Sequence, residues 1–240
     1  MRMLLSAVVG VLALAPHLHA TENSKPFCIV ALGDSITRGA RPAKGAIPAV
    51  LAEETFCALL EKSLSAQGRK AQVINVGVPS NRTDQGVIRL QADVLAYRPN
   101  IVLIMYGTND SCYDEGKTGP RLPLETYEKN LTAMIASIRA VGGTPILMTP
   151  PPLKDGWGFA RNAIYVQKGA NGAILPYVEA CRRIATAEKV PLIDHFQIWT
   201  TQGSLYIKSL LPDGCHPNAA GHKVLAKTIL PVVLKHMPPA

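Results

Sequence analysis

The amino-acid sequence predicts a three-layer α/β domain, in which helices cover both faces of a parallel sheet. Two observations predict it: short, almost continuous apolar runs recur along the chain, and longer segments with helically spaced apolar residues lie between them. Strands that are apolar on both faces are typical of a parallel sheet buried on both sides. The alternation of strand and helix favours right-handed crossovers between neighbouring strands. At 240 residues, the length allows one large domain or two small ones.

Five apolar runs are expected to form the strands, at residues 28–32, 73–76, 101–105, 145–148 and 191–193. Helical spacing is found at residues 49–66, 127–141, 174–190 and 218–236. Segments rich in proline and glycine, at 39–48, 111–123 and 150–172, each follow a strand or the short turn after it. Loops at the carboxyl ends of parallel strands form the ligand crevice of such sheets, so we expect these loops to surround a site. No linker or internal repeat interrupts residues 21–240, which we expect to form one domain.

Residues 1–20 have the pattern of a secretory signal peptide. Arg2 gives a positive start, residues 4–14 form an apolar run, Pro16 ends it, and the chain then reaches small Ala20. An uncleaved anchor is the competing interpretation, but a membrane span needs about 20 apolar residues, more than this run supplies. We expect cleavage after Ala20 and a secreted or periplasmic protein with no stable membrane insertion.

The composition excludes several classes of protein. Hydrophobic residues make up 48% of the chain and charged residues 18%, which is typical of a globular protein and not of a disordered, collagen-like or coiled-coil one. The formal net charge is +8, but the lysines and arginines are scattered. Because no nucleic-acid-binding motif accompanies them, we expect a solvated basic surface and no nucleic-acid partner. Attraction to an acidic polysaccharide or an anionic lipid is the alternative.

Metal chemistry has little support in the sequence. The five cysteines include no pair at the CxxC spacing of zinc or redox motifs. His195 and His222 have no companions at zinc-ligand spacing, and we expect both to be structural or surface residues. The sequence therefore predicts no metal site.

A serine follows the first predicted strand directly, in the segment Gly33-Asp34-Ser35. A glycine permits a tight turn here, which would place the hydroxyl and the backbone N–H of Ser35 in the crevice. Taken alone, the segment is explained more simply as a helix N-cap. Its interpretation therefore depends on which other residues accompany it.

Asp213 and His216 stand three residues apart near the other end of the chain. A turn can hold the carboxylate against one imidazole nitrogen, which leaves the other nitrogen free to take a proton from a serine. A turn aspartate followed by a capping histidine is the alternative, and spacing alone does not choose between the two.

Two further segments end the middle strands with hydrogen-bond donors. Gly77 follows the second strand and offers an unhindered backbone N–H, and Asn109 follows the third with a side-chain amide. Together with the N–H of Ser35, these donors would stabilise an oxyanion, and one such donor is typically worth about 3–4 kcal/mol of barrier. An ordinary turn at Gly77 and an Asx turn at Asn109 are the structural alternatives.

In this order, the four segments resemble the SGNH hydrolases, also called the GDSL esterase and lipase family. The resemblance covers most of residues 21–240 and implies a flavodoxin-like α/β/α sandwich. It implies Ser35 as the nucleophile, His216 as the general base and acid, and Asp213 as the orienting carboxylate. The oxyanion hole would consist of Ser35, Asn109 and a third donor. Members often carry that donor as a glycine three residues after Gly77, where this chain has Ser80, so either Gly77 or Ser80 supplies it.

The implied reaction is two-step acyl transfer through an acyl-enzyme, without a metal or organic cofactor. Polar loops, with Trp157 and Phe159 in segment 150–172, favour short acyl esters, including O-acetyl groups on carbohydrate. The alternatives are a lysophospholipase, arylesterase or thioesterase for longer acyl chains, and an acyltransferase. A non-catalytic carbohydrate-binding protein is a further alternative from another class.

Cys112 and Cys215 each lie within three residues of a candidate site residue. Because loops that converge on one crevice could bring them within bonding range, and an exported protein meets an oxidising compartment, we hypothesise a Cys112–Cys215 disulfide.

Overall fold

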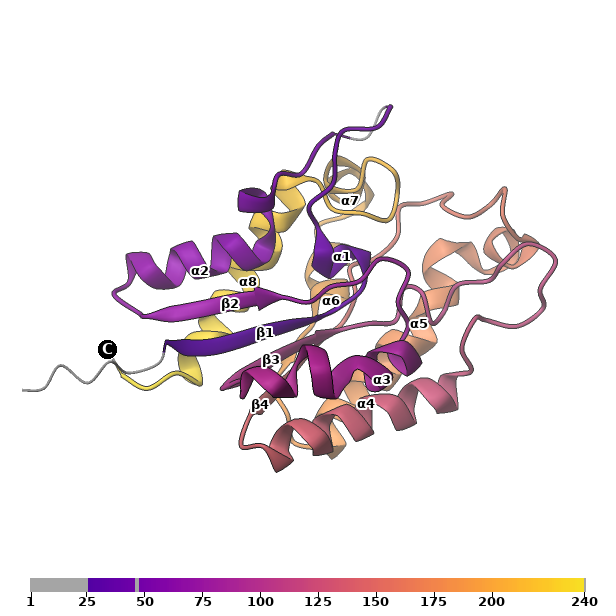
Figure 1. Ribbon diagram of the computed structural model, residues 1–240. Coiled ribbons are helices and arrows are strands. Elements are labelled where there is room, and N and C mark those ends of the chain that lie inside the picture. Colours follow the sequence, from indigo (N-terminus) through magenta and orange to yellow (C-terminus); the bar gives the residue numbers. More distant parts are fainter. Residues whose placement is uncertain (1–25, 46–47, 240) are drawn as a thin grey trace, which may run out of the picture.

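The computed structural model describes residues 26–45 and 48–239. Its centre is a five-stranded parallel sheet in the order β2-β1-β3-β4-β5 (Figure 1). The strands are β1 (Phe27–Gly33), β2 (Ala71–Asn75), β3 (Ile101–Met105), β4 (Thr144–Met148) and β5 (Leu192–Ile193). All five carboxyl ends therefore point to one edge of the sheet.

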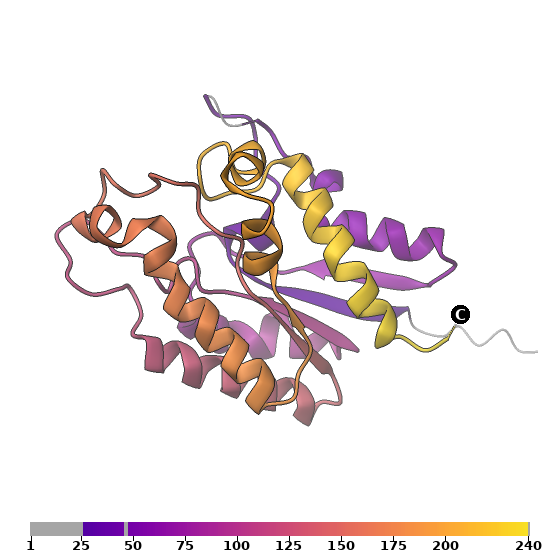
Figure 2. The same ribbon diagram turned by 180° about the vertical axis from the view of Figure 1, so that it is seen from behind.

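Helices cover both faces of the sheet (Figure 2). Their bounds are α1 (Ser35–Arg38), α2 (Phe56–Ala66), α3 (Thr83–Asp93), α4 (Leu124–Ala140), α5 (Ala163–Ala187), α6 (His195–Thr200), α7 (Ser204–Leu210) and α8 (Ala219–Lys235). Helices α3, α4 and α5 pack on one face of the sheet, against side chains such as Val30 and Ile104. Helices α2, α6, α7 and α8 pack on the other, against side chains such as Ala31 and Leu103. Alternate residues of each strand thus enter opposite cores, as in a three-layer sandwich.

The predicted strands are confirmed, with ends that shift by one or two residues. Helix α2 begins only at Phe56, because Thr55 caps its first turn and a short 3₁₀ turn at Ala52–Glu54 precedes it. Helix α5 begins at Ala163, inside the segment expected to be a loop, and Gly169 interrupts its helical backbone with a φ of 71°. Helix α3 was not expected, because its only buried residues are Thr83, Gly86 and Leu90.

The expected signal peptide, residues 1–20, lies outside the described residues. Within residues 26–45 and 48–239, none of the helices combines the length and hydropathy that a bilayer crossing requires.

The hypothesis of a Cys112–Cys215 disulfide is wrong in this structure, where all five cysteines are free and buried. The two loops do converge, since both cysteines line one cavity. Their side chains have different partners, however. Cys112 Sγ lies 3.1 Å from Arg161 Nη1, whereas Cys215 packs in a small apolar cluster with Leu153 and Ala170.

His195 and His222 are both fully buried, and we expect them to make the fold sensitive to acid. Burial lowers the pKa of His195 to about 3 and that of His222 to about 4, from an ordinary 6.5. In this range the unfolded chain binds protons that the folded protein does not, so stability is complete above pH 6.5 and falls as the pH drops below it. Each buried histidine should cost about 1.4 kcal/mol of unfolding free energy per pH unit.

Urea unfolding at pH 7 and pH 5 measures this loss. Burial raises the pKa of Asp34 to about 6, so this carboxyl binds its proton first in the folded state and offsets part of the loss. The variant His195→Asn should lose less stability between the two pH values than the wild type, whereas exposed His236→Asn should match it. Equal losses in all three proteins would contradict the assignment.

Candidate active site

The turn after β1 places Ser35 at the carboxyl edge of the sheet. Asp34 caps helix α1, and its Oδ1 accepts a hydrogen bond of 2.8 Å from the Ile36 N–H. A Cβ atom on Gly33 would lie 2.1 Å from Thr37 Oγ1 and 2.6 Å from the Met105 carbonyl oxygen. The turn therefore requires glycine at position 33, and it presents Ser35 at the first position of the helix.

Ser35, His216 and Asp213 form a continuous hydrogen-bonded series. Ser35 Oγ lies 2.9 Å from His216 Nε2, and His216 Nδ1 lies 2.6 Å from Asp213 Oδ2. The other carboxylate oxygen of Asp213 accepts from the backbone N–H groups of Cys215 at 3.0 Å and His216 at 2.7 Å. The loop before α8 thus fixes the carboxylate, and the carboxylate fixes the imidazole ring.

The protonation of this series follows from its contacts. Burial disfavours the charged form of Asp213, but the hydrogen bonds from the His216 side chain and from two backbone N–H groups outweigh it and lower the pKa of Asp213. An ionised carboxylate only accepts, so we assign the hydrogen to His216 Nδ1. The Nε2 atom then faces the Ser35 hydroxyl with a lone pair, which suits it to remove the hydroxyl proton.

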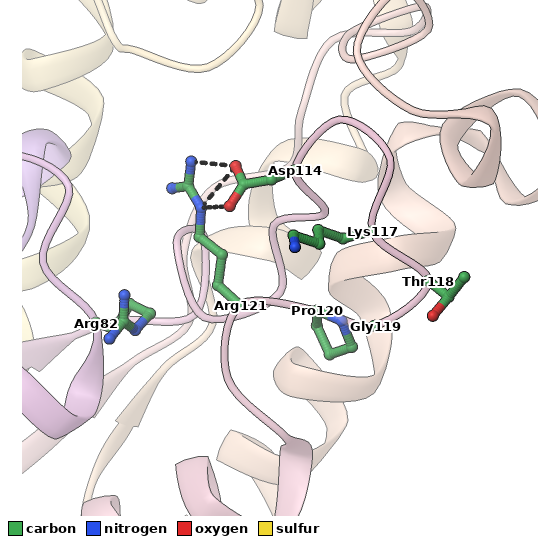
Figure 3. A pocket seen from close by; sticks show the side chains of 7 residues that line it. All are labelled: Arg82, Asp114, Lys117, Thr118, Gly119, Pro120 and Arg121. Carbon is green, nitrogen blue, oxygen red and sulfur yellow. Dashed lines mark hydrogen bonds and ion pairs between the residues drawn. The ribbon is translucent and has the colours of Figure 1, made fainter.

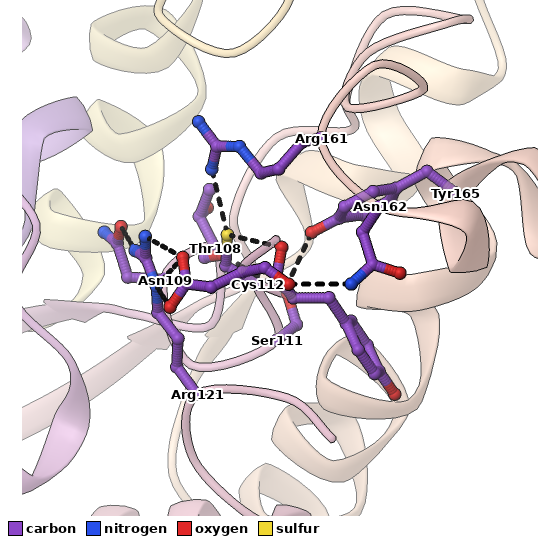
Figure 4. A network of polar contacts seen from close by, with 10 residues as sticks. Thr108, Asn109, Ser111, Cys112, Arg121, Arg161, Asn162 and Tyr165 are labelled. Carbon is purple, nitrogen blue, oxygen red and sulfur yellow. Dashed lines mark hydrogen bonds and ion pairs between the residues drawn. The ribbon is translucent and has the colours of Figure 1, made fainter. Parts of the chain in front are cut away.

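The side-chain amide of Asn109 is oriented from both ends. Its Nδ2 donates to Asp34 Oδ2 at 3.1 Å, and its Oδ1 accepts from Arg121 Nη1 at 3.3 Å. Arg121 is itself held by Asp114, with hydrogen bonds of 2.7 and 3.0 Å to the carboxylate (Figure 3). The second hydrogen of Nδ2 is left for the cavity (Figure 4), so that Asn109 can donate to a bound oxygen atom.

The structure distinguishes Gly77 from Ser80. The backbone N–H of Gly77 donates to Asn75 Oδ1 at 3.0 Å. Ser80, by contrast, lines the cavity beside Ser35 and has a left-handed φ of 64°. Among the described residues, the Ser80 N–H has no hydrogen-bond acceptor. Of the two residues, Ser80 is therefore the one that offers an unused donor to the cavity.

Gly77 has a packing role that can be tested. A Cβ atom there would lie 2.3 Å from the Arg38 nitrogen and 2.8 Å from the Asp34 carbonyl oxygen. Because these are backbone atoms of the nucleophile turn, Gly77→Ala must displace that turn, at a cost of about 1–3 kcal/mol in unfolding free energy. Thermal melts should show a clear loss for this variant and little change for Gly119→Ala, where a Cβ atom meets nothing within 4 Å. Equal melting temperatures would show that the turn adapts freely.

Arg89 supports the site and was not expected from the sequence. Its guanidinium donates to the carbonyl oxygens of Gly33 at 3.0 Å and Val76 at 2.7 Å, to Asn81 Oδ1 at 2.9 Å and to the Tyr106 hydroxyl at 2.9 Å. It therefore ties the turn after β1 to the segment that carries Ser80. An arginine on an amphipathic helix carries no local signal of such a role, because all four partners are distant in the sequence.

These side chains surround a cavity of about 290 Å³ at the carboxyl edge of the sheet. Its wall consists of Ser35, Ser80, Thr108, Asn109, Cys112, Arg121, Trp157, Arg161, Asp213, Cys215 and His216. The wall is predominantly polar. Among the described residues, no cluster of three histidine, cysteine or carboxylate side chains could hold a metal ion.

A parallel α/β sandwich that presents serine, histidine and aspartate in series beside hydrogen-bond donors defines an enzyme that hydrolyses esters. The model of the GDSL-like Lipase/Acylhydrolase family matches residues 31–224, and the chain belongs to this family.

Similar proteins include enzymes that act on acetate esters. The chain is 28% identical over 179 residues to the isoamyl acetate-hydrolyzing esterase 1 homolog of Bos taurus, with 70% of each chain covered. It is 27% identical to an acetylxylan esterase of Geobacillus stearothermophilus whose solved structure, a catalytic mutant, matches with a TM-score of 0.68 and covers 85% of this chain and 92% of that one. It is also 28% identical over 220 residues to lipoprotein YqeF of Bacillus subtilis, covering 84% of this chain and 87% of that protein.

Proposed function

We propose that the protein is a secreted serine esterase that hydrolyses short acyl esters, including O-acetyl groups on carbohydrate, through an acyl-enzyme. The observation that carries the proposal is the series from Ser35 Oγ through the His216 ring to the Asp213 carboxylate, with contacts of 2.9 and 2.6 Å. This is the arrangement that activates a serine hydroxyl for nucleophilic attack.

In the first half of the reaction, His216 Nε2 takes the Ser35 proton as Oγ attacks the ester carbonyl. The negative charge that develops on the carbonyl oxygen is stabilised by the Ser35 and Ser80 backbone N–H groups and by Asn109 Nδ2. Asp213 stabilises the imidazolium. When the tetrahedral intermediate collapses, His216 gives its proton to the departing alcohol, and the acyl group stays on Ser35.

In the second half, a water molecule replaces the alcohol. His216 takes a proton from this water, the hydroxide attacks the acyl carbonyl, and the same donors stabilise the second tetrahedral intermediate. Collapse returns the proton to Ser35 Oγ and releases the carboxylic acid. The chain's own residues supply every proton transfer in this scheme.

Two observations support short acyl groups. The cavity wall beside Ser35 is polar and contains no long apolar groove, so a long acyl chain would find little apolar surface to cover it. Relatives named for isoamyl acetate and for acetylxylan point to acetate as the acid part.

Export is the remaining part of the proposal. Residues 1–20 have the composition of a signal peptide, and a relative that covers most of the chain is named a lipoprotein. Both support a location outside the cytoplasm.

A series of 4-nitrophenyl esters, from acetate to decanoate, tests the substrate class. We expect kcat/KM to be highest for acetate and to fall steadily towards octanoate. A maximum at octanoate or beyond would favour a lysophospholipase or thioesterase instead. Product analysis with a sugar alcohol present would detect an acyltransferase, and binding of acetylated glycans without turnover would favour the carbohydrate-binding alternative.

A further inference from the structure

Arg161 lies in the active-site cavity with most of its donors unused. Its Nη1 lies 3.1 Å from Cys112 Sγ, and its guanidinium carbon lies 5.2 Å from the centre of the Trp157 ring. In the part of the chain that the structure describes, its side chain forms no ion pair and no other hydrogen bond. Figure 4 shows one terminal nitrogen directed at the sulfur and the other directed away from the polar network.

These contacts hold the side chain without satisfying it. A thiol sulfur is a weak acceptor, and a ring face attracts a cation without using its N–H donors. The guanidinium is therefore oriented at the edge of the cavity, with donors available for a planar pair of oxygen atoms. A carboxylate matches this geometry, because it can accept two parallel hydrogen bonds from one guanidinium.

The surroundings of Arg161 favour an anion. Arg161 also lines a neighbouring hollow together with Lys117, and Lys117 and Arg121 line a third one with Arg82 (Figure 3).

The acidic side chains that line the three hollows are Asp114 and Asp213. Both already have partners, since Asp114 pairs with Arg121 and Asp213 holds His216. The walls thus present an excess of positive charge next to Ser35, which raises the local concentration of negatively charged substrates.

We propose that the natural substrate is an acyl ester that carries a carboxylate, such as an O-acetylated acidic sugar, and that Arg161 binds this carboxylate beside the reacting bond. This inference rests on the proposed esterase function and narrows it to anionic esters. The carboxylate can belong to the alcohol part of the ester or to the acyl part, and the two sources are separated by the choice of probe.

Two matched pairs of esters test the proposal. For the alcohol side, the pair is 4-acetoxybenzoate and its neutral methyl ester; for the acyl side, it is the 4-nitrophenyl hemiester of succinate and 4-nitrophenyl butyrate. We compare the ratio of kcat/KM for the anionic and neutral member between variants, so that differences in intrinsic reactivity cancel. The variants are Arg161→Gln, Arg161→Lys and, as a control with the same charge loss, Arg183→Gln, which pairs with Glu128 on an exposed surface.

In Arg161→Gln, we expect the anionic-to-neutral ratio of one pair to fall about tenfold, the effect of losing a hydrogen-bonded charge pair. Arg161→Lys should retain part of the preference, and Arg183→Gln should leave it unchanged. If the ratio of both pairs is the same in Arg161→Gln and wild type, the inference is overturned, while hydrolysis of the neutral esters leaves the esterase proposal intact. Failure of the wild type to hydrolyse any ester would instead contradict the proposed function itself.

A salt titration of the wild type decides the matter if Arg161→Gln does not fold. Sodium chloride should lower kcat/KM for the anionic member of the pair and leave the neutral member almost unchanged, because salt screens the charge interaction. The same contrast is expected between partially acetylated polygalacturonate and acetylxylan, with acetate release as the readout. Equal salt dependence of the charged and neutral substrates would overturn the inference.

Discussion

Replacing Ser35 with alanine is expected to lower kcat for 4-nitrophenyl acetate by about 10⁴- to 10⁶-fold. The variant lacks the atom that attacks the carbonyl, and no neighbouring group can take its place in the series with His216 and Asp213. The oxyanion donors remain, so a small residual rate above that of water should persist. Steady-state kinetics with purified protein measure the loss.

His216→Ala should lose a similar factor, and the double variant Ser35→Ala with His216→Ala should lose no more than either single one. This non-additivity is expected because the residues act as one unit. Ser137→Ala is the matched control, since its hydroxyl is exposed on α4 and contacts only the Ala133 carbonyl oxygen. Full activity of Ser35→Ala, or additive losses in the double variant, would contradict the assigned roles.

Replacing Asn109 with alanine is expected to lower kcat by about 10²- to 10³-fold with little change in KM, because the lost hydrogen bond is strongest in the transition state. The amide is oriented by Asp34 and Arg121 at 3.1 and 3.3 Å, so its donor is fixed before the substrate binds. Kinetics over a range of substrate concentrations separate the two parameters.

Asn109→Asp sharpens this test. It keeps the shape of the side chain but replaces the donor with an acceptor beside the buried Asp34 carboxyl. We expect it to be at least as impaired as Asn109→Ala. If Asn109→Asp retained wild-type kcat, the amide would not be an oxyanion donor.

The sheet could be predicted from the sequence because its strands are buried on both faces. A run such as residues 101–105, which is fully apolar and fully buried, carries its own signal. Helix α3 could not be predicted in this way, since it turns only Thr83, Gly86 and Leu90 into the core and its apolar spacing is weak. Helices α6 and α7 are six and seven residues long, too short for a periodic pattern to stand out.

The candidate site divides in the same manner. Asp213 and His216 are close in sequence, and backbone N–H groups fix the carboxylate locally, so their pairing could be inferred from spacing. The orientation of Asn109 depends on Asp34 and Arg121, and the turn around Ser35 depends on Arg89. These contacts join different strands and loops, and only the folded chain brings them together.

Two sequence expectations show the limits of motif spacing. A glycine and a serine three residues apart both offered a second oxyanion donor, and only the path of the loop places Ser80 in the cavity wall. Cys112 and Cys215 were expected to bond because their loops converge. They do converge, but each side chain is directed to a different partner.

The central claim is that Ser35 becomes acylated, and trapping the acyl-enzyme tests it most directly. Wild-type protein is mixed with excess 4-nitrophenyl acetate, quenched in acid within the first turnovers, digested and analysed by mass spectrometry, with Ser35→Ala treated alongside. The account predicts one added acetyl group on the peptide that contains Ser35, and none on that peptide in the variant. An acetyl group on another residue that forms at the rate of turnover, with Ser35 unmodified, would contradict it.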